Sequence, residues 1–434
     1  MQYYSLNNQS PPVSFREATI KGQASDKGLY FPTSIPKLDR DLIDNLSNTP
    51  DAEIAYRVIK PYVGDTIVDA ELYRIAAESI DFPIPLVKVT DRASSLELFH
   101  GPTLAFKDVG ARFMSRCLGQ FVKSGDKKLT VLVATSGDTG GAVANGFFDI
   151  PGINVVILYP SGKVSSVQEK QLTTLGKNIH AIEVNGTFDQ CQQLVKRAFA
   201  DTKLNDAIFL TSANSINVAR WLPQQFYYFF ALKQWNDQTT MPIVSVPSGN
   251  FGNICAGILA RASGLPIKHF IASCNANDTV PRFLSTGIYN PVESVSTLSN
   301  AMDVAEPSNF IRILEIYHQQ LDDLKEVVSS YSFSDQETIH MIQRLFSEYN
   351  YLADPHGAIG YLGLEKWLAD HPTDKGIFLE TAHPVKFPDA IKRAINQDVP
   401  IPESLNGLLL ADKESIKMEP DYNELSSHLQ HLAK

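Results

Sequence analysis

A single lysine, Lys107, lies in the stretch HGPTLAFKDVG (residues 100–110) at the point where a helix is predicted to begin. The first turn of a helix carries a partial positive charge, so a cation is disfavoured there. Burial also favours the neutral form of an amine, and only a neutral amine attacks a carbonyl. Phe106 and Phe113 would supply an apolar wall around it. Lys107 is therefore either a lysine that extends into water or a reactive amine.

A glycine-rich loop, VPSGNFGNICAG (residues 246–257), follows a predicted buried strand and leads into a helix. Backbone N–H groups at such a helix start favour an anion. Gly249 and Gly252 would let the backbone close around a phosphate, and Asn250 and Asn253 would offer further donors. The loop matches neither GxxxxGK[ST] nor GxGxxG. Taken alone, it is equally consistent with a phosphate site and with a tight turn.

A second loop of this kind, ATSGDTGGA (residues 134–142), occurs in the preceding block of alternating strands and helices. Ser136, Thr139 and the amides after Gly137 would form a smaller anion site, suited to a carboxylate. Asp138 would repel an anion unless its side chain points elsewhere. Ser, Asp and Thr are also ordinary residues at the start of a helix, so the loop does not require a ligand.

Two weaker signals come from the ends of other predicted strands. LTSANSINVARW (residues 210–221) places Asn214 and Arg220 at a strand end and early in the next helix. Arginine is suited to bidentate phosphate binding, although a solvated surface arginine is the commoner explanation. FLETAHP ends a buried strand with Thr381, a residue type that is also common in strands.

The elements that must position these residues are short apolar strands alternating with helices. The alternation covers residues 128–213 and 242–286, with one long helix predicted over 216–235 between them. It is typical of parallel βαβ units, which bind ligands at the carboxyl ends of their strands. Two α/β subdomains that face each other across a cleft would fit this pattern.

Outside these two blocks the pattern is less regular. Helices are predicted near residues 51–63 and 69–80 in the N-terminal part. Residues 322–331 (DDLKEVVSSY) and 335–350 (DQETIHMIQRLFSEYN) are predicted to form surface helices. The segment KGIFLETAHP, residues 375–384, is predicted to contain one more buried strand with its exit loop.

Charge and composition argue against several kinds of partner. The 434 residues carry a net charge of −10 without a basic cluster, so a nucleic-acid partner is not expected. No apolar run approaches the roughly 18 residues that a membrane span needs. The first residues lack the basic start and apolar stretch of a signal peptide. We therefore expect a cytoplasmic protein.

A protein-bound metal is not expected either. The ten histidines form no HExxH or HxH pattern, and the cysteines form no CxxC pattern. Reduced, structural cysteines are the simplest interpretation. The four cysteines are Cys117, Cys191, Cys255 and Cys274.

Nine motifs together are more specific than any one of them. They are SFREA, GLYFP, LFHGPTLAFKD, TSGDTGGA, SANSIN, PSGNFGN, NDTVPRFL, LSNAMDV and TAHPVKF, in this order between about residues 14 and 388. The series resembles the fold-type II pyridoxal-phosphate enzymes, and among them the threonine synthase family in its longer bacterial and fungal form.

The resemblance implies a fold similar to that of the tryptophan synthase β chain. This is an α/β fold with two mostly parallel subdomains around a cleft and an N-terminal extra domain. We expect the N-terminal domain at residues 1–90 and the smaller subdomain, with Lys107, at 91–225. The larger cofactor-binding domain, with the GNFGN loop and the C-terminal helices, is expected at 226–434.

The resemblance also implies roles for the singled-out residues. Lys107 is expected to hold pyridoxal 5'-phosphate as a Schiff base. Thr381 is expected to form a hydrogen bond with the pyridine nitrogen, and its neutral hydroxyl would leave that nitrogen unprotonated. The cofactor phosphate is expected to bind Gly249, Asn250, Phe251, Gly252 and Asn253. The substrate is expected to bind Thr135, Ser136, Thr139, Asn214 and Arg220, with Thr103 as a further candidate.

One position departs from the wider fold-type II pattern. Many fold-type II enzymes have SGNTG where this chain has SGDTG. The long threonine synthases are similar to this chain in having Asp at that position. Asp138 must then be turned away from the cofactor or paired with another group. The sequence leaves these two alternatives open.

The reaction implied by the resemblance converts O-phospho-L-homoserine and water into L-threonine and phosphate by β,γ-replacement, the last step of threonine biosynthesis. Lys107 is the expected general base of this carbon–oxygen lyase. A threonine or serine dehydratase, or a phospho-amino-acid lyase, is the alternative on the same fold. A dehydratase would not need the second phosphate site that Asn214 and Arg220 would form.

Two other classes fit less well. Nucleotide or hydride chemistry on a Rossmann-like sheet would need phosphate loops but not Lys107, and a non-catalytic cofactor-binding protein would not need the complete set. The expected partner is a small-molecule substrate, with no nucleic acid and no membrane, and the chain is expected to be a monomer or a homodimer.

Overall fold

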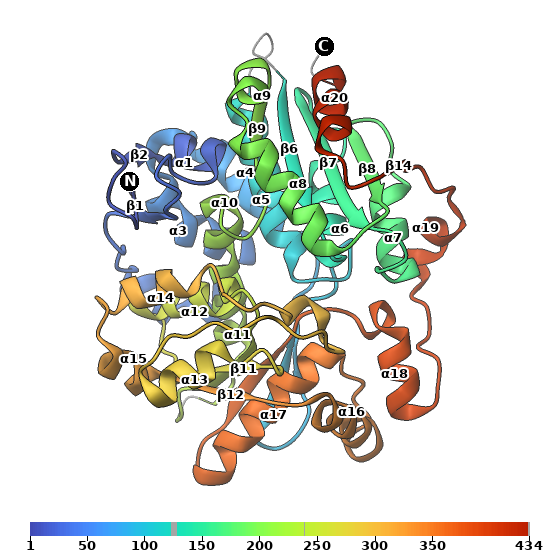
Figure 1. The fold of residues 1–434 in the computed structure, drawn as a ribbon. Coiled ribbons are helices and arrows are strands. Elements are labelled where there is room, and N and C mark those ends of the chain that lie inside the picture. The colour runs from blue at the N-terminus through green and yellow to red at the C-terminus, as the bar shows by residue number, and fades with distance from the viewer. Residues whose placement is uncertain (123–127, 238, 433–434) are drawn as a thin grey trace.

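The computed structural model describes residues 1–122, 128–237 and 239–432 and arranges them around three sheets (Figure 1). One sheet has five strands, all parallel, in the order β14-β8-β7-β6-β9. Its strands are β6 (Leu129–Ala134), β7 (Ile153–Pro160), β8 (Ile179–Val184), β9 (Phe209–Thr211) and β14 (Ile416–Met418). The helices around it are α5 (Lys107–Phe121), α6 (Asp138–Phe147), α7 (Ser166–Thr173), α8 (Phe188–Ala200), α9 (Thr202–Ala207), α19 (Asn406–Leu410) and α20 (Tyr422–Leu432).

The second sheet has six strands in the order β12-β11-β10-β13-β5-β4, and only β4 runs antiparallel to its neighbour. Its strands are β4 (Leu86–Lys88), β5 (Ala93–Glu97), β10 (Ile243–Pro247), β11 (His269–Cys274), β12 (Val328–Ser332) and β13 (Gly376–Glu380). Every residue of β10, β11 and β13 is buried, as expected for parallel strands covered on both faces. The surrounding helices are α12 (Gly252–Ala262), α13 (Thr279–Thr286), α14 (Phe310–Ile316), α15 (Leu321–Val327), α16 (Asp335–Tyr349), α17 (Pro355–Asp370) and α18 (Pro388–Ile395).

The N-terminal part adds a small antiparallel sheet and four helices. The sheet has the order β2-β1-β3, and the predicted helices near 51–63 and 69–80 are confirmed as α3 and α4. The elements are β1 (Gln2–Ser5), β2 (Val13–Ser14), β3 (Tyr30–Pro32), α1 (Phe15–Lys21), α2 (Arg40–Asp44), α3 (Asp51–Val63) and α4 (Asp69–Ser79). Short 3-10 turns occur at Leu46–Asn48, Gly64–Thr66, Asn300–Met302, Pro384–Lys386 and Glu403–Leu405.

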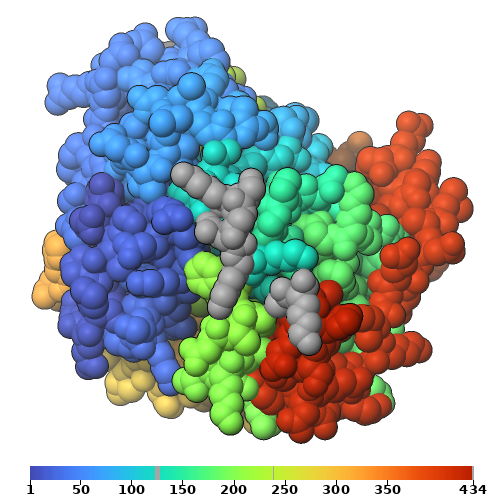
Figure 2. All heavy atoms as spheres, turned by 90° about the horizontal axis from the view of Figure 1, so that it is seen from above, coloured from blue at the N-terminus to red at the C-terminus, as the bar shows by residue number. Residues whose placement is uncertain are grey.

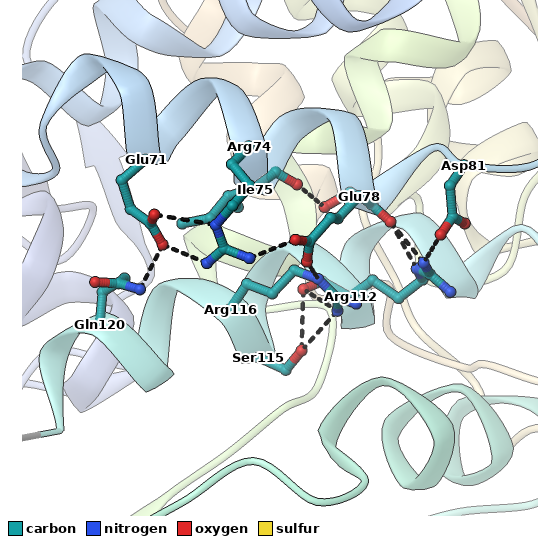
Figure 3. Close-up of polar contacts among 10 residues, drawn as sticks. Glu71, Arg74, Ile75, Glu78, Asp81, Arg112, Ser115, Arg116 and Gln120 are labelled. Atoms are coloured by element: carbon teal, nitrogen blue, oxygen red, sulfur yellow. Dashed lines mark hydrogen bonds and ion pairs between the residues drawn. The ribbon is translucent and has the colours of Figure 1, made fainter.

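A hydrogen-bonded ion-pair network joins helix α4 to helix α5, which begins at Lys107 (Figure 3). Glu78 Oε2 lies 2.7 Å from Arg116 Nε, and the backbone oxygen of Glu78 accepts from Arg112 Nη2 at 2.6 Å and from Nε at 3.0 Å. Arg74 pairs with both Glu71 and Glu78 on α4. Partly exposed pairs of this kind contribute only about 0–1 kcal/mol each. The network orients α5 against the N-terminal part, and the packed apolar side chains supply most of the stability.

The long helix predicted over residues 216–235 is interrupted. The structure has α10 (Val218–Trp221), a 3-10 turn at Leu222–Gln225 and α11 (Phe226–Gln234). Pro223 is the reason, because proline has no N–H to donate and clashes with the preceding turn of an α-helix. The apolar composition alone concealed this break.

A second correction concerns the helix predicted over residues 322–331. The helix α15 ends at Val327, and the following residues form β12, the edge strand of the six-stranded sheet. Val328 pairs in parallel with Phe270 of β11. A neighbouring strand such as β11 decides whether the residues after a short helix continue the helix or form a strand. The local sequence does not show that neighbour. The helix predicted over 335–350 is confirmed as α16.

Two strands lie on the other side of the predicted domain division. β5, expected in the smaller subdomain of residues 91–225, pairs with β13 in the six-stranded sheet, where Gly376 lies opposite Ala93. β14, expected in the larger domain of residues 226–434, pairs with β8 in the five-stranded sheet. Seen from above, the C-terminal residues (red) lie against the green residues that include α8 and α9 (Figure 2). The chain therefore crosses between the sheets more often than its sequence blocks indicate.

The apolar core continues from the N-terminal part through both sheets. One cluster of buried residues includes Phe15 from α1, Phe113 from α5, Val131 from β6 and Val246 from β10. The predicted strand within 375–384 is confirmed as β13. None of the helices in the described ranges has the length and apolar character needed to cross a membrane.

Candidate active site

Lys107 is the first residue of α5, as predicted, and its side chain is only 16% exposed. Its Nζ lies 4.9 Å from the centre of the Phe106 ring. Burial lowers the pKa of Lys107, and the charges of Lys386 and Arg220 lower it further, while Asp138 opposes them. The apolar surroundings and the helix start therefore favour the neutral amine, and Lys107 does not extend into water.

Thr381 lies beside Phe106, the residue before Lys107, although the two are far apart in the sequence. The N–H of Phe106 donates to the carbonyl oxygen of Thr381 at 2.9 Å, and Ala105 and Ala382 form an isolated antiparallel bridge. The exit of β13 is thus hydrogen-bonded to the segment that leads into α5. Thr381 is 6% exposed, so most of this residue is covered by protein.

Asp138, the first residue of α6, is paired rather than turned away. Its Oδ1 lies 2.8 Å from Lys386 Nζ and accepts from Gln168 Nε2 at 2.9 Å, and its Oδ2 lies 3.7 Å from Lys107 Nζ. Burial on its own raises the pKa of Asp138, but Lys386 and then Lys107 lower it far below its usual value. Asp138 is therefore an ionised carboxylate with Lys386 as its nearest counter-charge, and the helix start adds to this.

The SGDTG loop is shaped from within by Thr135. The Thr135 hydroxyl accepts from the N–H groups of Gly137 at 3.0 Å and Gly140 at 2.9 Å, and it donates to the Gly137 oxygen at 3.1 Å. Gly137 has φ of 142°, a value that side-chain-bearing residues rarely adopt. The Thr135 hydroxyl is thus occupied within the loop, whereas Ser136 and Thr139 are half-buried at its surface. Their contacts with a substrate carboxylate stay a prediction.

The GNFGN loop ends at the start of α12, where Gly252 is the first helical residue and Phe251 is left-handed with φ of 59°. The Asn250 side chain is engaged at both ends: Nδ2 donates to Ser215 Oγ at 2.6 Å, and Oδ1 accepts from the Ser308 N–H at 2.6 Å. One N–H of Asn250 Nδ2 is therefore used within the protein, and the contact of Asn250 with a phosphate stays a prediction.

Asn253 differs from Asn250 in having one free donor group. Its Oδ1 accepts from the Tyr228 hydroxyl at 2.8 Å, while its Nδ2 is buried and has no hydrogen-bond partner among the described residues. A buried donor without a partner costs about 1–3 kcal/mol, so such groups generally mark a ligand or a bound water. Asn253 Nδ2 lies in the first turn of α12, where an anion is favoured.

Substitution of Gly249 tests whether the close packing of this loop is needed to bind the cofactor phosphate. A Cβ at Gly249 would lie 2.5 Å from the Met302 Cα, so Gly249→Ala must displace backbone. Overpacking of this kind costs about 1–3 kcal/mol, and we expect both a lower unfolding free energy and weaker cofactor binding. Chemical denaturation and titration with pyridoxal phosphate would measure the two effects. Gly407→Ala is the matched control, since a Cβ there meets nothing within 4 Å; equal effects of both variants would contradict this prediction.

Arg220 is buried in α10 at 3% exposure. Its Nη1 donates to the Ala213 oxygen, and its Nε has no partner among the described residues. Burial lowers the pKa of Arg220 to about 10, against the opposing influence of Tyr227 and Asp108. Buried arginines are normally paired, so this guanidinium has unused capacity to bind an anion. Asn214 is half-buried just before α10, and its N–H donates to Ser212 Oγ at 3.3 Å.

The predicted phosphate loop and the predicted substrate loop are in direct contact. Ser215, between Asn214 and Arg220, accepts hydrogen bonds from Asn250 Nδ2 at 2.6 Å and from Asn309 Nδ2 at 3.4 Å. Asn309 Nδ2 also donates to the backbone oxygen of Asn250 at 3.1 Å. The structure therefore brings the two predicted anion-binding segments into contact, and Arg220 is near enough to Lys107 to lower the pKa of that lysine.

These groups fit pyridoxal phosphate. A largely buried amine with a lowered pKa, an unpartnered amide donor at a helix start and a buried hydroxyl match its aldehyde, phosphate and ring nitrogen. The residues that would hold these three groups are Lys107, Asn253 and Thr381. Among the described ranges, no group of three or more His, Cys, Asp or Glu side chains is arranged to hold a metal ion.

Sequence reasoning missed several residues of this site. Lys386 and Gln168 bind Asp138, and the Tyr227 hydroxyl donates to the Phe106 oxygen just before Lys107. Asp354 at the start of α17 also influences the pKa of Lys107. Lys386 lies in the motif TAHPVKF. A charged residue among apolar neighbours was the one signal in the sequence that could have indicated its role.

Three family models match this chain. The model described as pyridoxal-phosphate dependent enzyme matches residues 95–378. The models described as threonine synthase N terminus and threonine synthase, C-terminal, match residues 2–80 and 357–429. Together they extend over nearly the whole chain.

Curated relatives and solved structures agree with these models. The chain is 45% identical to a threonine synthase from Haemophilus influenzae over 99% of both chains, and 44% identical to one from Serratia marcescens over 93% of both. A crystal structure titled PLP bound threonine synthase, from Brucella melitensis, superposes with a TM-score of 0.94 at 34% identity and covers 100% of both chains. On its sequence, its fold and the arrangement around Lys107, the chain belongs to the threonine synthase family of pyridoxal-phosphate dependent enzymes.

Proposed function

We propose that this enzyme converts O-phospho-L-homoserine and water into L-threonine and phosphate. The observation that carries the proposal is Arg220, a buried guanidinium with an unpartnered Nε whose charge reaches Lys107. A substrate that carries its own phosphate would neutralise this cation. A dehydratase acting on unphosphorylated threonine or serine would leave it buried and unmatched.

Lys107 is the group that would move protons. Its amine lies in an apolar site that favours the neutral form, so Lys107 would accept the proton from the substrate α-carbon and later return one. When bound, pyridoxal phosphate supplies the electron sink that stabilises the negative charge left on the carbon. Thr381 would hold the ring nitrogen with a neutral hydroxyl, which keeps that sink moderate.

Other residues would orient the substrate. Ser136 and Thr139 at the start of α6 would bind its α-carboxylate, and Asp138 does not oppose this because Lys386 balances its charge. Asn214 and Arg220 would hold the leaving phosphate. Orientation within a site closed to water is the main protein contribution to such a reaction.

The test is incubation of the purified chain and pyridoxal phosphate with O-phospho-L-homoserine, with threonine and phosphate measured together. Equal amounts of the two products are expected. Phosphate accompanied by a 2-oxo acid would instead indicate a lyase that does not add water at the β-carbon. Absence of both products would reject the proposed substrate.

We further propose a cytoplasmic enzyme that acts as a monomer or a homodimer. All four cysteines are buried and free, which suits a reducing compartment. Light scattering on the purified chain would separate the two assembly states.

A further inference from the structure

Lys386 is a second buried lysine close to Lys107. It ends the 3-10 turn Pro384–Lys386, and its side chain is 0% exposed. Its ammonium lies 2.8 Å from Asp138 Oδ1 and donates to the Thr103 oxygen at 2.7 Å. Lys107 Nζ lies 3.7 Å from Asp138 Oδ2. One carboxylate therefore lies between two lysines, each near a different oxygen.

The geometry decides which lysine carries the charge. One carboxylate balances one ammonium, and a second buried cation would be desolvated without compensation. Lys386 has the closer contact and a carbonyl acceptor as well, whereas Lys107 faces the Phe106 ring at a longer distance from the carboxylate. Gln168 adds a further donor to the oxygen that Lys386 binds. Lys386 is therefore the better placed of the two lysines to balance Asp138.

The remaining charges around Lys107 agree with this assignment. Arg220 on α10 disfavours a cation at Lys107, and Asp354 at the start of α17 favours one less strongly. Asp108, the next residue along α5, accepts hydrogen bonds from the N–H and the hydroxyl of Thr103. Burial is the largest influence, and the net effect is a lowered pKa of Lys107.

We propose that Lys386 is a positioning residue that keeps Lys107 neutral by balancing the charge of Asp138. The inference rests on the proposed function, because it concerns Lys107 as the reactive amine. Without Lys386, the buried carboxylate would have Lys107 as its remaining lysine partner and would hold it as an ammonium. An ammonium has no lone pair with which to attack the cofactor aldehyde.

The experiment follows attachment of pyridoxal phosphate to the cofactor-free full chain by absorbance as a function of pH. The midpoint is the pH at which attachment reaches half of its maximal rate. Lys386→Met keeps the apolar stem of the side chain and removes its charge, so this midpoint is expected to move to higher pH. Below that midpoint, attachment should slow about tenfold for each unit by which the pKa of Lys107 rises. The double variant Asp138→Asn/Lys386→Met removes both charges, and its midpoint is expected to return to the original value or below. Acetylation of Lys107 by acetic anhydride, quantified by mass spectrometry, gives the same midpoint without the cofactor.

Asp138→Asn alone gives an independent test if Lys386→Met does not fold. Lys107 would then keep the repulsion of Lys386 and lose the attracting carboxylate, so its midpoint is expected to fall. Lys268→Met is the matched control, because Lys268 forms its ion pair with Asp374 at 2.6 Å. This variant is expected to leave the midpoint unchanged.

Three results would overturn the inference. They are an unchanged midpoint in Lys386→Met, a double variant that behaves like Lys386→Met, and an unchanged or higher midpoint in Asp138→Asn. A role in folding alone would slow attachment at every pH without moving the midpoint. If the unsubstituted chain never attached the cofactor, the proposed function would fail, while the acetylation midpoints would still decide the role of Lys386.

Discussion

Replacing Lys107 with alanine is expected to reduce threonine formation below detection. Loss of proton transfer alone lowers rates by roughly 10²–10⁴-fold, and the variant also loses the amine that attaches the cofactor. Some pyridoxal phosphate should still bind through its phosphate, because Asn253 Nδ2 and the start of α12 are unaffected. The measurements are threonine and phosphate release, with cofactor content determined by absorbance after gel filtration.

The control for this variant is Lys268→Ala, which removes a lysine in another ion pair of the described structure. Both proteins should unfold as cooperatively as the original chain, and only Lys107→Ala should be inactive. Threonine formation by Lys107→Ala at the original rate would show that another group performs the proton transfers.

Replacing Arg220 with methionine is expected to raise the KM for O-phospho-L-homoserine by at least about tenfold, because hydrogen bonds to a charged group contribute about 1.5–3 kcal/mol. The same variant should unfold with an unchanged or higher free energy. Arg220 is a buried cation whose Nε is unpartnered among the described residues, and such a group costs folding free energy. Initial rates against substrate concentration and denaturation without ligand would measure the two effects.

Arg312 provides the matched comparison, since it is also a fully buried arginine. Its guanidinium donates to the Tyr30 oxygen at 2.9 Å, the Ile216 oxygen at 2.7 Å and Asn309 Oδ1 at 2.7 Å, and it lies over the Trp221 ring. Arg312→Met should therefore lower the unfolding free energy by about 3 kcal/mol or more, because several buried acceptors lose their donor. Arg220 is not a substrate ligand if Arg220→Met destabilises the chain equally and leaves KM unchanged.

The different stability effects expected for Arg220→Met and Arg312→Met follow from the partners of the two arginines. A buried arginine whose donors are used by the protein holds the fold together, as Arg312 does between the N-terminal sheet, the 214–217 segment and the segment before α14. A buried arginine with a free donor keeps that donor for a ligand, at a cost in stability. Comparing stability with substrate affinity therefore separates structural residues from binding residues in this site.

The sequence by itself determined the elements whose signals are local. Helices α3 and α4, the buried strand β13 and the start of α5 at Lys107 follow from periodicity and from short motifs of neighbouring residues. The nine motifs likewise indicated the family, because their order along the chain is specific. Pro223 was an available local signal for the break between α10 and α11, but the apolar run around it outweighed it.

Only the tertiary structure decided the partners of each segment. β14 joins β8 at an edge of the five-stranded sheet, and β5 lies between β13 and β4 inside the six-stranded sheet. The residue types of a strand do not specify which distant strand it pairs with, so the folded chain decides these neighbours. The Asn250 side chain, predicted as a phosphate donor, also binds Ser215 and Ser308, which come from two other segments that its own sequence neighbourhood does not reveal.

The same holds for the charge of Lys107. The helix start and the aromatic neighbours of Lys107 were visible in the sequence, and they predicted an environment that disfavours a cation. The pairing of Asp138 with Lys386 was not visible, because the two residues lie in distant segments that meet only in the fold. Burial and the nearest charges set the protonation of a group, and both are properties of the packed structure, so the sequence could not reveal that Lys386 lies closer to Asp138 than Lys107 does.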